Sequence, residues 1–434
     1  MTDPVTSAAL RPADPKHRLP VKTLIAASVG NAVEWYDWTV YATFSIYFAT
    51  QIFSKEDPKL ALLGTFATYA LAFFFRPLGG YIIGRYADLR GRKAAMMLTI
   101  FLMAGGSLVI AVLPTFSQVG WLAPILLLVA RIGQGMSLGG EVANASAYLA
   151  EIAPPARRGR YSSFFYVSTG SAILVASLLG ALLASTLTKD QLGSWGWRIA
   201  FLTGGALGLV GLWLRRDMAE TEQYHENKEK ARSIKNPFWV ILRHHPLAVA
   251  QIVGITLLST LCYYTFFSAL TPFAVTFRGA DAGEVFIALS IATALFVALQ
   301  YPFGALSDRR GRKPQLLFWA AAIAILIVPL SKLIGPGIGR MTVVFCVGLG
   351  LYSMMSALAP AIMSELFPTE LRGLGIGTWY NITVATFGGT APFVITALSN
   401  AGHPDAFFWY VAAGAAVAFV TILSLKETNG SVLR

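Results

Sequence analysis

Charged side chains stand within segments of this 434-residue chain that are otherwise apolar. Glu34 and Asp37 fall in the first such segment, Arg76 in the second, and Arg131 and Glu141 in the fourth. At bilayer depth an ionised group costs about 2.5 to 3.5 kcal/mol on insertion scales unless it is paired or hydrated. If these segments cross a membrane, the five residues are predicted to face the protein interior or a water-filled cavity, where they could bind a charged solute or carry a proton.

The carboxylates are candidates for proton coupling. Glu34 lies about 18 Å along a helix from Lys22, which places it near the middle of a bilayer. Asn31, Glu34 and Trp38 are three and four residues apart, so they share a helix face that Asp37 joins. A carboxylate there can carry a proton, because burial disfavours its charged form and a nearby arginine favours it. A permanent ion pair between helices remains the alternative for Glu34.

Arg131 and Glu141 complete the set of candidate coupling residues. Arg131, Gly135 and Gly139 form the pattern R-x-x-x-G-x-x-x-G, in which the glycines allow close helix packing and the arginine projects on the same side. For Glu141, a contact at the cytoplasmic interface remains the alternative.

Two arginines could bind a carboxylate substrate. Arg76 and Arg131 are both predicted within spans, and a guanidinium can hold a carboxylate through two parallel hydrogen bonds. Neutral side chains could add hydrogen bonds, although an intramembrane tyrosine can equally serve packing. The candidates of this kind are Asn31, Tyr41, Gln134, Tyr263, Tyr264, Gln300, Tyr380 and Asn381.

The composition requires elements that cross a membrane. Hydrophobic residues make up 55% of the chain and charged residues 13%, with a mean hydropathy of +0.60, so there is more apolar surface than a soluble core could bury. About 20 helical residues cross a hydrocarbon core. Twelve segments satisfy this length: 22–53, 59–84, 94–113, 121–150, 160–187, 196–214, 246–277, 283–306, 315–334, 341–364, 374–400 and 404–425.

The position of the basic residues predicts the topology. A net charge of +12 could indicate a nucleic-acid partner, but most Lys and Arg residues cluster in the tails and in the loops after even-numbered segments. This pattern predicts that both termini are cytoplasmic, that the lipid bilayer is the main partner and that no nucleic acid is bound. The first 20 residues are polar and lack the apolar core of a cleavable signal peptide, so we expect a bacterial-type inner-membrane protein.

The chain divides into two halves at its one long hydrophilic interruption. The mixed charges of that interruption are interpreted as a solvated linker. The predicted parts are an N-terminal tail (1–21), a six-helix bundle (22–214), the linker (215–245), a second six-helix bundle (246–425) and a C-terminal tail (426–434).

The two halves repeat one another. The loop that runs from Gly84 to Lys93 returns from Gly304 to Lys313 with its glycines, its aspartate and its Arg-Lys pair in register. A second pattern, E-x-x-P-x-x-x-R-G, begins at Glu151 and again at Glu365 with nearly the same offset. Two matches at one period predict an all-α membrane protein of two related six-helix bundles.

The repeated G-x-x-x-D-x-x-G-R-K loop resembles that of the major facilitator superfamily. Motifs in the first, second, fourth and eleventh segments are similar to those of its metabolite:proton symporter family, whose members take up citrate, 2-oxoglutarate, shikimate, or proline and betaine. One departure is that Leu89 stands where the family usually has an arginine. The motif stretches are Gly30–Asp37, Arg76–Gly80, Gln134–Glu141 and Phe387–Gly389.

The resemblance implies proton-coupled uptake of a small organic acid, with the R-x-x-x-G-x-x-x-G segment involved in coupling and no cofactor other than the proton. It also implies that charged loop residues close the cytoplasmic side in one state, although the arginines among them can equally be topology signals. The implied gate residues are Gly84, Asp88, Arg92, Arg158, Asp308, Arg312 and Arg372.

Other classes of function are less consistent with the sequence. The histidines lie in tails, in the linker or at segment ends, so neither a metal site nor an enzyme's catalytic base is expected. Cys262 and Cys346 fall inside predicted spans, and no disulfide is expected. A proton/osmolyte symporter, an uncoupled uniporter, an anion exchanger and a non-transporting nutrient sensor remain alternatives. We expect a monomer.

Overall fold

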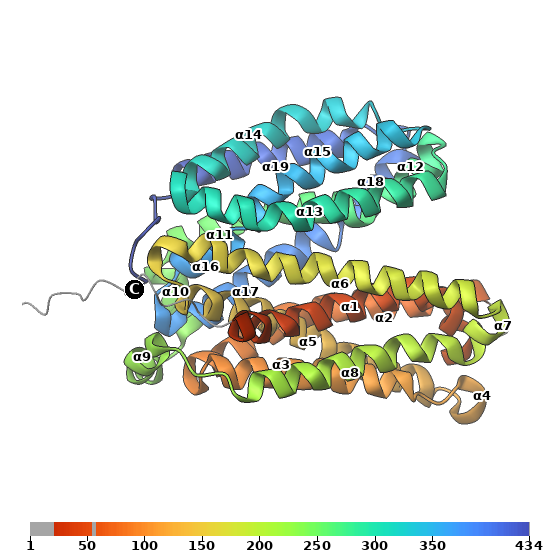
Figure 1. Cartoon of the computed structure of the whole chain (residues 1–434), viewed down its shortest axis with the longest axis horizontal. Coiled ribbons are helices and arrows are strands. Elements are labelled where there is room, and N and C mark those ends of the chain that lie inside the picture. Colours follow the sequence, from red (N-terminus) through yellow and green to blue (C-terminus); the bar gives the residue numbers. More distant parts are fainter. Residues whose placement is uncertain (1–20, 54–57, 434) are drawn as a thin grey trace, which may run out of the picture.

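The chain folds into two helical bundles that lie side by side with their long axes nearly parallel (Figure 1). The computed structural model describes residues 21–53 and 58–433, so the predicted N-terminal tail up to residue 20 lies outside the described residues. Within those ranges every regular element is helical.

The first bundle is formed by six long helices among the described residues: α1 (Val21–Ile52), α2 (Pro58–Arg90), α3 (Arg92–Ala111), α5 (Leu122–Glu151), α6 (Arg158–Thr186) and α8 (Trp197–Arg216). Shorter turns connect them: α4 (Phe116–Val119), η1 (Pro155–Arg157), α7 (Lys189–Gln191) and η2 (Leu192–Gly196). The linker contains α9 (Glu222–Ser233) and α10 (Pro237–His244).

The second bundle repeats this plan with more interruptions. Its elements are α11 (Pro246–Tyr264), η3 (Thr265–Ala269), α12 (Leu270–Arg278), α13 (Ala282–Arg310), α14 (Arg312–Ser331), α15 (Ile338–Ser356), α16 (Ala359–Leu366), η4 (Thr369–Leu371), α17 (Arg372–Thr383), η5 (Val384–Gly388), α18 (Ala391–Asn400) and α19 (Ala406–Leu423).

The helices have the length and composition of membrane spans. Ten helical segments among the described residues are long and apolar enough to cross a membrane, and they include every long helix from α3 onward. α1 and α2, with 32 and 33 residues, are also long enough and pack within the first bundle. The prediction of twelve spans in two six-helix bundles is confirmed.

Three predicted spans are interrupted within the second bundle. The seventh and eleventh each contain a π-helical turn, η3 and η5, and the tenth bends between α15 and α16. π-helical turns break the regular hydrogen-bond ladder and occur frequently at functional sites. All three interruptions belong to helices that reach the cavity described below.

The bundles contact each other most extensively along two helix pairs, α2 with α17 and α6 with α13, and α5 also packs against α16 and α17. Glycines permit the close approach. A Cβ atom at Gly84 would collide with the carbonyl oxygen of Gly373, and Gly80 faces Gly377 in the same way. The loops after α2 and α13 turn through Gly91 and Gly311, whose φ angles of 108° and 94° few other residues adopt.

The linker and the C-terminal residues lie at one end of the molecule, here called the linker end (Figure 1). α1 begins there, since the Lys22 amine lies 3.7 Å from the Asp217 carboxylate. Arg215, the first residue of the predicted linker, belongs to the last turn of α8, which continues to Arg216, and it is fully buried.

Candidate substrate site and charge networks

A narrow cavity of about 20 Å³, enough for about one water molecule, lies between the two bundles. α1, α2 and α6 contribute one residue each, and α11, α15, α17 and η5 contribute the rest. The lining residues are Trp35, Arg76, Tyr166, Ser259, Thr260, Tyr263, Tyr264, Tyr352, Tyr380 and Val384. The lining therefore combines one cation with aromatic rings and hydroxyl groups.

Arg76 is the charged residue of this lining, and it is almost fully buried. Its Nη1 donates a long hydrogen bond of 3.4 Å to the Tyr264 hydroxyl, and its guanidinium lies 5.2 Å from the ring centre of Phe73. Its Nε has no hydrogen-bond partner, and it forms no ion pair with any described acidic residue. A buried cation left in this condition has capacity for an anionic ligand.

Aromatic rings enclose the rest of the cavity. The ring centres of Trp35 and Tyr263 are 5.0 Å apart, and those of Tyr263 and Tyr264 are 5.2 Å apart. Tyr166 and Tyr352 meet edge to face across the bundle interface at 6.3 Å. This packing fixes the rings, so that their hydroxyls can bind a polar ligand without losing much further conformational freedom.

Arg131, the second predicted clamp, does not line the cavity. Its Nη1 lies 3.1 Å from the Asp37 carboxylate and donates to Gln134 at 2.7 Å, and its guanidinium stacks on Tyr41 at 4.1 Å and Trp38 at 4.5 Å. All five side chains are buried inside the first bundle. Arg131 and Asp37 thus form an ion pair between α5 and α1.

Glu34 has no such partner. Its Oε1 accepts a hydrogen bond of 2.7 Å from Ser137, while its Oε2 is buried without a hydrogen-bond partner among the described residues. Its near neighbour Glu141 is different, because Arg215 forms an ion pair with it and Thr99 donates to it at 2.5 Å. Of the four predicted coupling residues, Glu34 is therefore the one that lacks an ion-pair partner.

Most of the other predicted ligands are occupied by contacts between helices. Asn31 donates to Phe165, Ser168 and Thr169 of α6. Tyr41 bonds to Thr65 and Thr68, Gln300 to Ser356, and Asn381 to Gly139. Of the ten residues predicted to bind substrate, four line the cavity: Arg76, Tyr263, Tyr264 and Tyr380.

The repeated loops meet across the bundle interface at the linker end. The Asp88 carboxylate accepts hydrogen bonds from the backbone amides of Gly373 (3.0 Å) and Leu374 (3.1 Å) at the start of α17. It also pairs with Arg92 at 2.6 Å. A carboxylate at a helix N-terminus satisfies free amides and complements the helix dipole.

The second copy of the loop makes the equivalent contact. Asp308 accepts from the amides of Gly159 (2.8 Å) and Arg160 (3.1 Å) at the start of α6, and Arg312 lies farther from it, at 3.8 Å. We call the two contacts the Asp88 latch and the Asp308 latch. Each latch joins one bundle to the other. Asp88 and Asp308 are two of the predicted gate residues. The other five lie beside these contacts: Gly84, Arg92, Arg158, Arg312 and Arg372.

Two glutamates that the sequence placed only in a repeat reinforce the latches. Glu151 pairs with Arg372 of the other bundle at 2.6 Å and with Arg92 at 3.4 Å. Glu365 pairs with Arg158 of the other bundle at 2.5 Å and with Arg312 at 3.0 Å. Each glutamate therefore connects an arginine from each bundle.

A third repeat was not predicted from the sequence. Glu220 accepts from the amides of Arg92 and Lys93, so it is not simply a solvated linker residue. Glu427 does the same for Arg312 and Lys313. Burial raises the pKa of Glu427, but these amide bonds outweigh burial and leave it below its usual range. The shared Glu-Thr pair that follows each bundle was the available signal.

Known proteins resemble this chain over nearly its full length. It is 38% identical over 407 residues to the alpha-ketoglutarate permease of Escherichia coli (strain K12), covering 93% of each chain. It is 34% identical over 418 residues to a putative proline/betaine transporter of Staphylococcus haemolyticus (strain JCSC1435), covering 95% of this chain and 89% of the relative. These relatives are transporters, not enzymes.

Solved structures share the fold. The proton:xylose symporter XylE bound to 6-bromo-6-deoxy-D-glucose superimposes with a TM-score of 0.79 at 18% identity, over 95% of this chain and 97% of that one. FucP in the outward conformation gives 0.68 at 17% identity, over 93% and 99%.

Two linked six-helix bundles with a polar cavity between them define a multi-pass membrane transporter. The family model described as Major Facilitator Superfamily matches residues 27–390, with a further match over 256–432. The chain belongs to this superfamily, as the repeated loops predicted.

Proposed function

We propose that this protein takes up a small organic acid, a mono- or dicarboxylate, together with protons across a bacterial inner membrane. The observation that supports this most directly is Arg76, a buried cation that lines the central cavity without an acidic partner among the described residues. A substrate carboxylate would supply the missing charge. The name of the 38% identical permease points to the same class of substrate.

The linker end is proposed to face the cytoplasm, in agreement with the distribution of Lys and Arg. With this orientation, the latches would hold the bundles together on the cytoplasmic side. Release of the latches would let the bundles rock apart, and the cavity would then open to the cytoplasm.

Glu34 is proposed to carry the coupling proton. It is buried on α1, the helix that also contributes Trp35 to the cavity, and it lacks an ion-pair partner. Protonation removes the cost of burying its charge. Asp37, in contrast, is matched by Arg131, so it is proposed to hold α1 against α5.

The test is uptake of radiolabelled 2-oxoglutarate into proteoliposomes with an imposed inward proton gradient. We expect Arg76→Gln to weaken binding by about 10- to 100-fold, which is the range for losing a hydrogen bond to a charged group. Arg85→Gln is the matched control, because Arg85 lies on the same helix but bonds to the linker carbonyls of Ala231 and Ile234.

The same vesicles test coupling. Glu34→Gln should abolish uptake driven by the proton gradient yet preserve exchange of labelled for unlabelled substrate. Equal loss of uptake and exchange would reject Glu34 as the proton carrier, and uptake by the wild type that ignores the gradient would reject symport. Unchanged affinity in Arg76→Gln would reject the anion site.

A zwitterion is the second candidate substrate. The aromatic rings around Arg76 could hold a quaternary ammonium group by cation–π attraction while Arg76 binds the carboxylate. The 34% identical relative is named a putative proline/betaine transporter. Competition of labelled 2-oxoglutarate uptake by unlabelled betaine or by succinate distinguishes the two classes.

A further inference from the structure

The short linker helix α10 (Pro237–His244) lies across the ends of helices from both bundles. Its Phe238 ring stacks on Trp379 of α17 at 5.5 Å and meets Tyr81 of α2 edge to face at 6.4 Å. Ile241 is buried beneath the helix, whereas Trp239 is 56% exposed. One face of the linker helix therefore packs on the bundles, and the other face is exposed.

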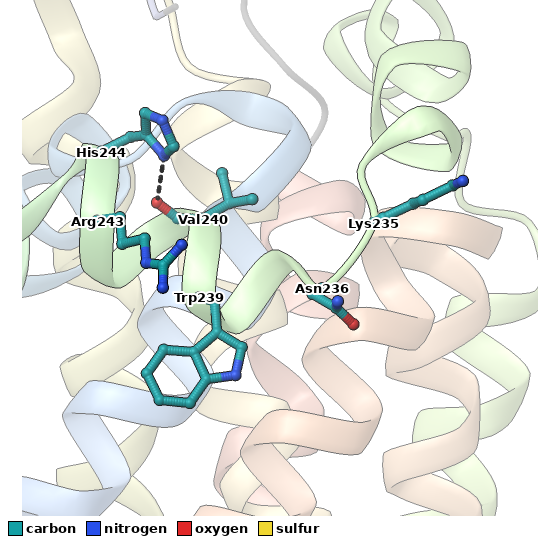
Figure 2. Close-up of a pocket in the computed structure, with 6 residues that line it drawn as sticks. All are labelled: Lys235, Asn236, Trp239, Val240, Arg243 and His244. Carbon is teal, nitrogen blue, oxygen red and sulfur yellow. Dashed lines mark hydrogen bonds between the residues drawn. The ribbon is translucent and has the colours of Figure 1, made fainter.

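The exposed face of α10 contributes to a pocket that is separate from the central cavity (Figure 2). His244 donates from Nδ1 to the Val240 carbonyl at 3.2 Å, which leaves its Nε2 available for another partner. The lining residues are Lys235, Asn236, Trp239, Val240, Arg243 and His244. No acidic residue is among them.

The cations of this pocket are not matched by acids. Lys235 and Arg243 are exposed, and neither forms an ion pair with a described residue, unlike Arg232 of the preceding helix, which pairs with Glu229. Asn236 has a left-handed backbone with φ of 51°, which turns the chain between α9 and α10, and Lys235 and Arg243 line the pocket from its two sides (Figure 2). An anion would be attracted to this concave basic surface.

The place of the pocket in the fold indicates which anion. The span α11 begins at Pro246, two residues after α10 ends, and the adjacent apolar Leu247 is 58% exposed. Exposed Trp239 has the amphipathic character of residues found at the level of lipid headgroups. We propose that this pocket binds the phosphate headgroup of an anionic phospholipid, with Lys235 and Arg243 as its charged ligands.

The test is the thermal unfolding midpoint of the full-length protein in detergent, titrated with short-chain phosphatidylglycerol. The wild type should be stabilised in a saturable way, while phosphatidylcholine and inorganic phosphate at equal concentration should have no effect. Lys235→Gln/Arg243→Gln should raise the half-saturating concentration at least about tenfold, since each basic residue contributes to attraction by anionic lipid.

The matched control is Lys230→Gln/Arg232→Gln, which removes the same charge from exposed positions of α9 outside the pocket. It should respond to phosphatidylglycerol as the wild type does. An equal response of both double variants would overturn the proposal, and stabilisation by inorganic phosphate alone would assign the pocket to a soluble anion instead. Both variants should have wild-type midpoints without lipid, because the altered side chains are exposed.

Discussion

The two bundles have the same fold but bury their charges at different depths. In the first bundle Glu34, Asp37 and Arg131 are buried in the middle of long helices. In the second bundle the buried charged residues among those described are Arg312 and Arg372, both at the linker end. Repetition of the fold has therefore not been accompanied by repetition of the chemistry.

The difference suggests a division of labour. The first bundle supplies a cation, Arg76, and a carboxylate, Glu34, that form no ion pair with another described residue, and the proposed symport would use both. The second bundle supplies Tyr263, Tyr264 and Tyr380 to the cavity, together with two π-helical turns. At the linker end the bundles are alike again, because each latch needs one partner from each side.

The comparison predicts its largest effect at the Glu141–Arg215 pair. Glu141→Gln leaves the Arg215 guanidinium buried without its counter-ion, so the free energy of unfolding should fall by about 3 to 5 kcal/mol. In the second bundle Gln315→Leu removes neutral hydrogen bonds to the carbonyls of Met354 (2.8 Å) and Phe303 (3.3 Å) and should cost about 1 to 2 kcal/mol. Unfolding by SDS titration in mixed micelles measures both losses.

The control for that prediction is Glu141→Leu/Arg215→Met, which removes both charges and should recover a large part of the loss. Equal losses for Glu141→Gln and Gln315→Leu would contradict the idea that buried charge distinguishes the bundles.

The next effect concerns the latches, where the bundles are alike but not identical. Asp88 lies 2.6 Å from Arg92, whereas Asp308 lies 3.8 Å from Arg312. Asp88→Asn should therefore raise the population that is open at the linker end by about tenfold, which corresponds to roughly 1.4 kcal/mol. Asp308→Asn should raise the same population by only about threefold.

Maleimide labelling of Ser163→Cys can measure this opening. A Cβ atom built at Gly304 would lie 3.1 Å from the Ser163 Cβ, so this position is covered while α6 packs on α13. Cys262→Ala and Cys346→Ala remove the other thiols from the chain. Identical labelling of both aspartate variants would mean that the arginine distances do not affect the latches.

Much of the fold was predictable because its causes are local or repeated. Apolar segment length gave the spans, and the duplicated loops with Asp88 and Asp308 gave the two bundles and the meeting of charged residues at the linker end. The interruptions of the second bundle were not predictable, because a π-helical turn depends on packing against neighbouring helices.

Only part of the site could be predicted, because spacing along one helix does not reveal which residues of other helices contact it. Arg76 and Arg131 look alike in the sequence, since each is a lone arginine in an apolar segment. Their environments differ because Asp37 reaches Arg131 from another helix, a contact that spacing along one helix does not reveal. Arg215 was assigned to the linker for a related reason, as its buried partner Glu141 lies far away in the chain.

The smallest predicted effect lies at the end opposite the linker. In the second bundle Asp405 forms ion pairs with Lys332 and Arg278, the hydrogen bond from Lys332 being the main cause of an Asp405 pKa below its usual value. In the first bundle Arg198 instead donates to the backbone carbonyls of Ala111 and Leu113 at 2.9 and 2.8 Å, which do not titrate near neutral or acidic pH.

A lowered carboxylate pKa stabilises the fold above the unfolded value of about 3.9, and this stabilisation is lost as the pH falls through the folded value. The difference in thermal midpoint between the wild type and Asp405→Asn should be constant above about pH 5 and shrink below about pH 4. It should reflect less than about 1 kcal/mol, because the carboxylate is 36% exposed. Arg198→Gln should lower the midpoint equally at pH 6 and pH 4, so a matching pH dependence in both variants would remove this distinction between the bundles.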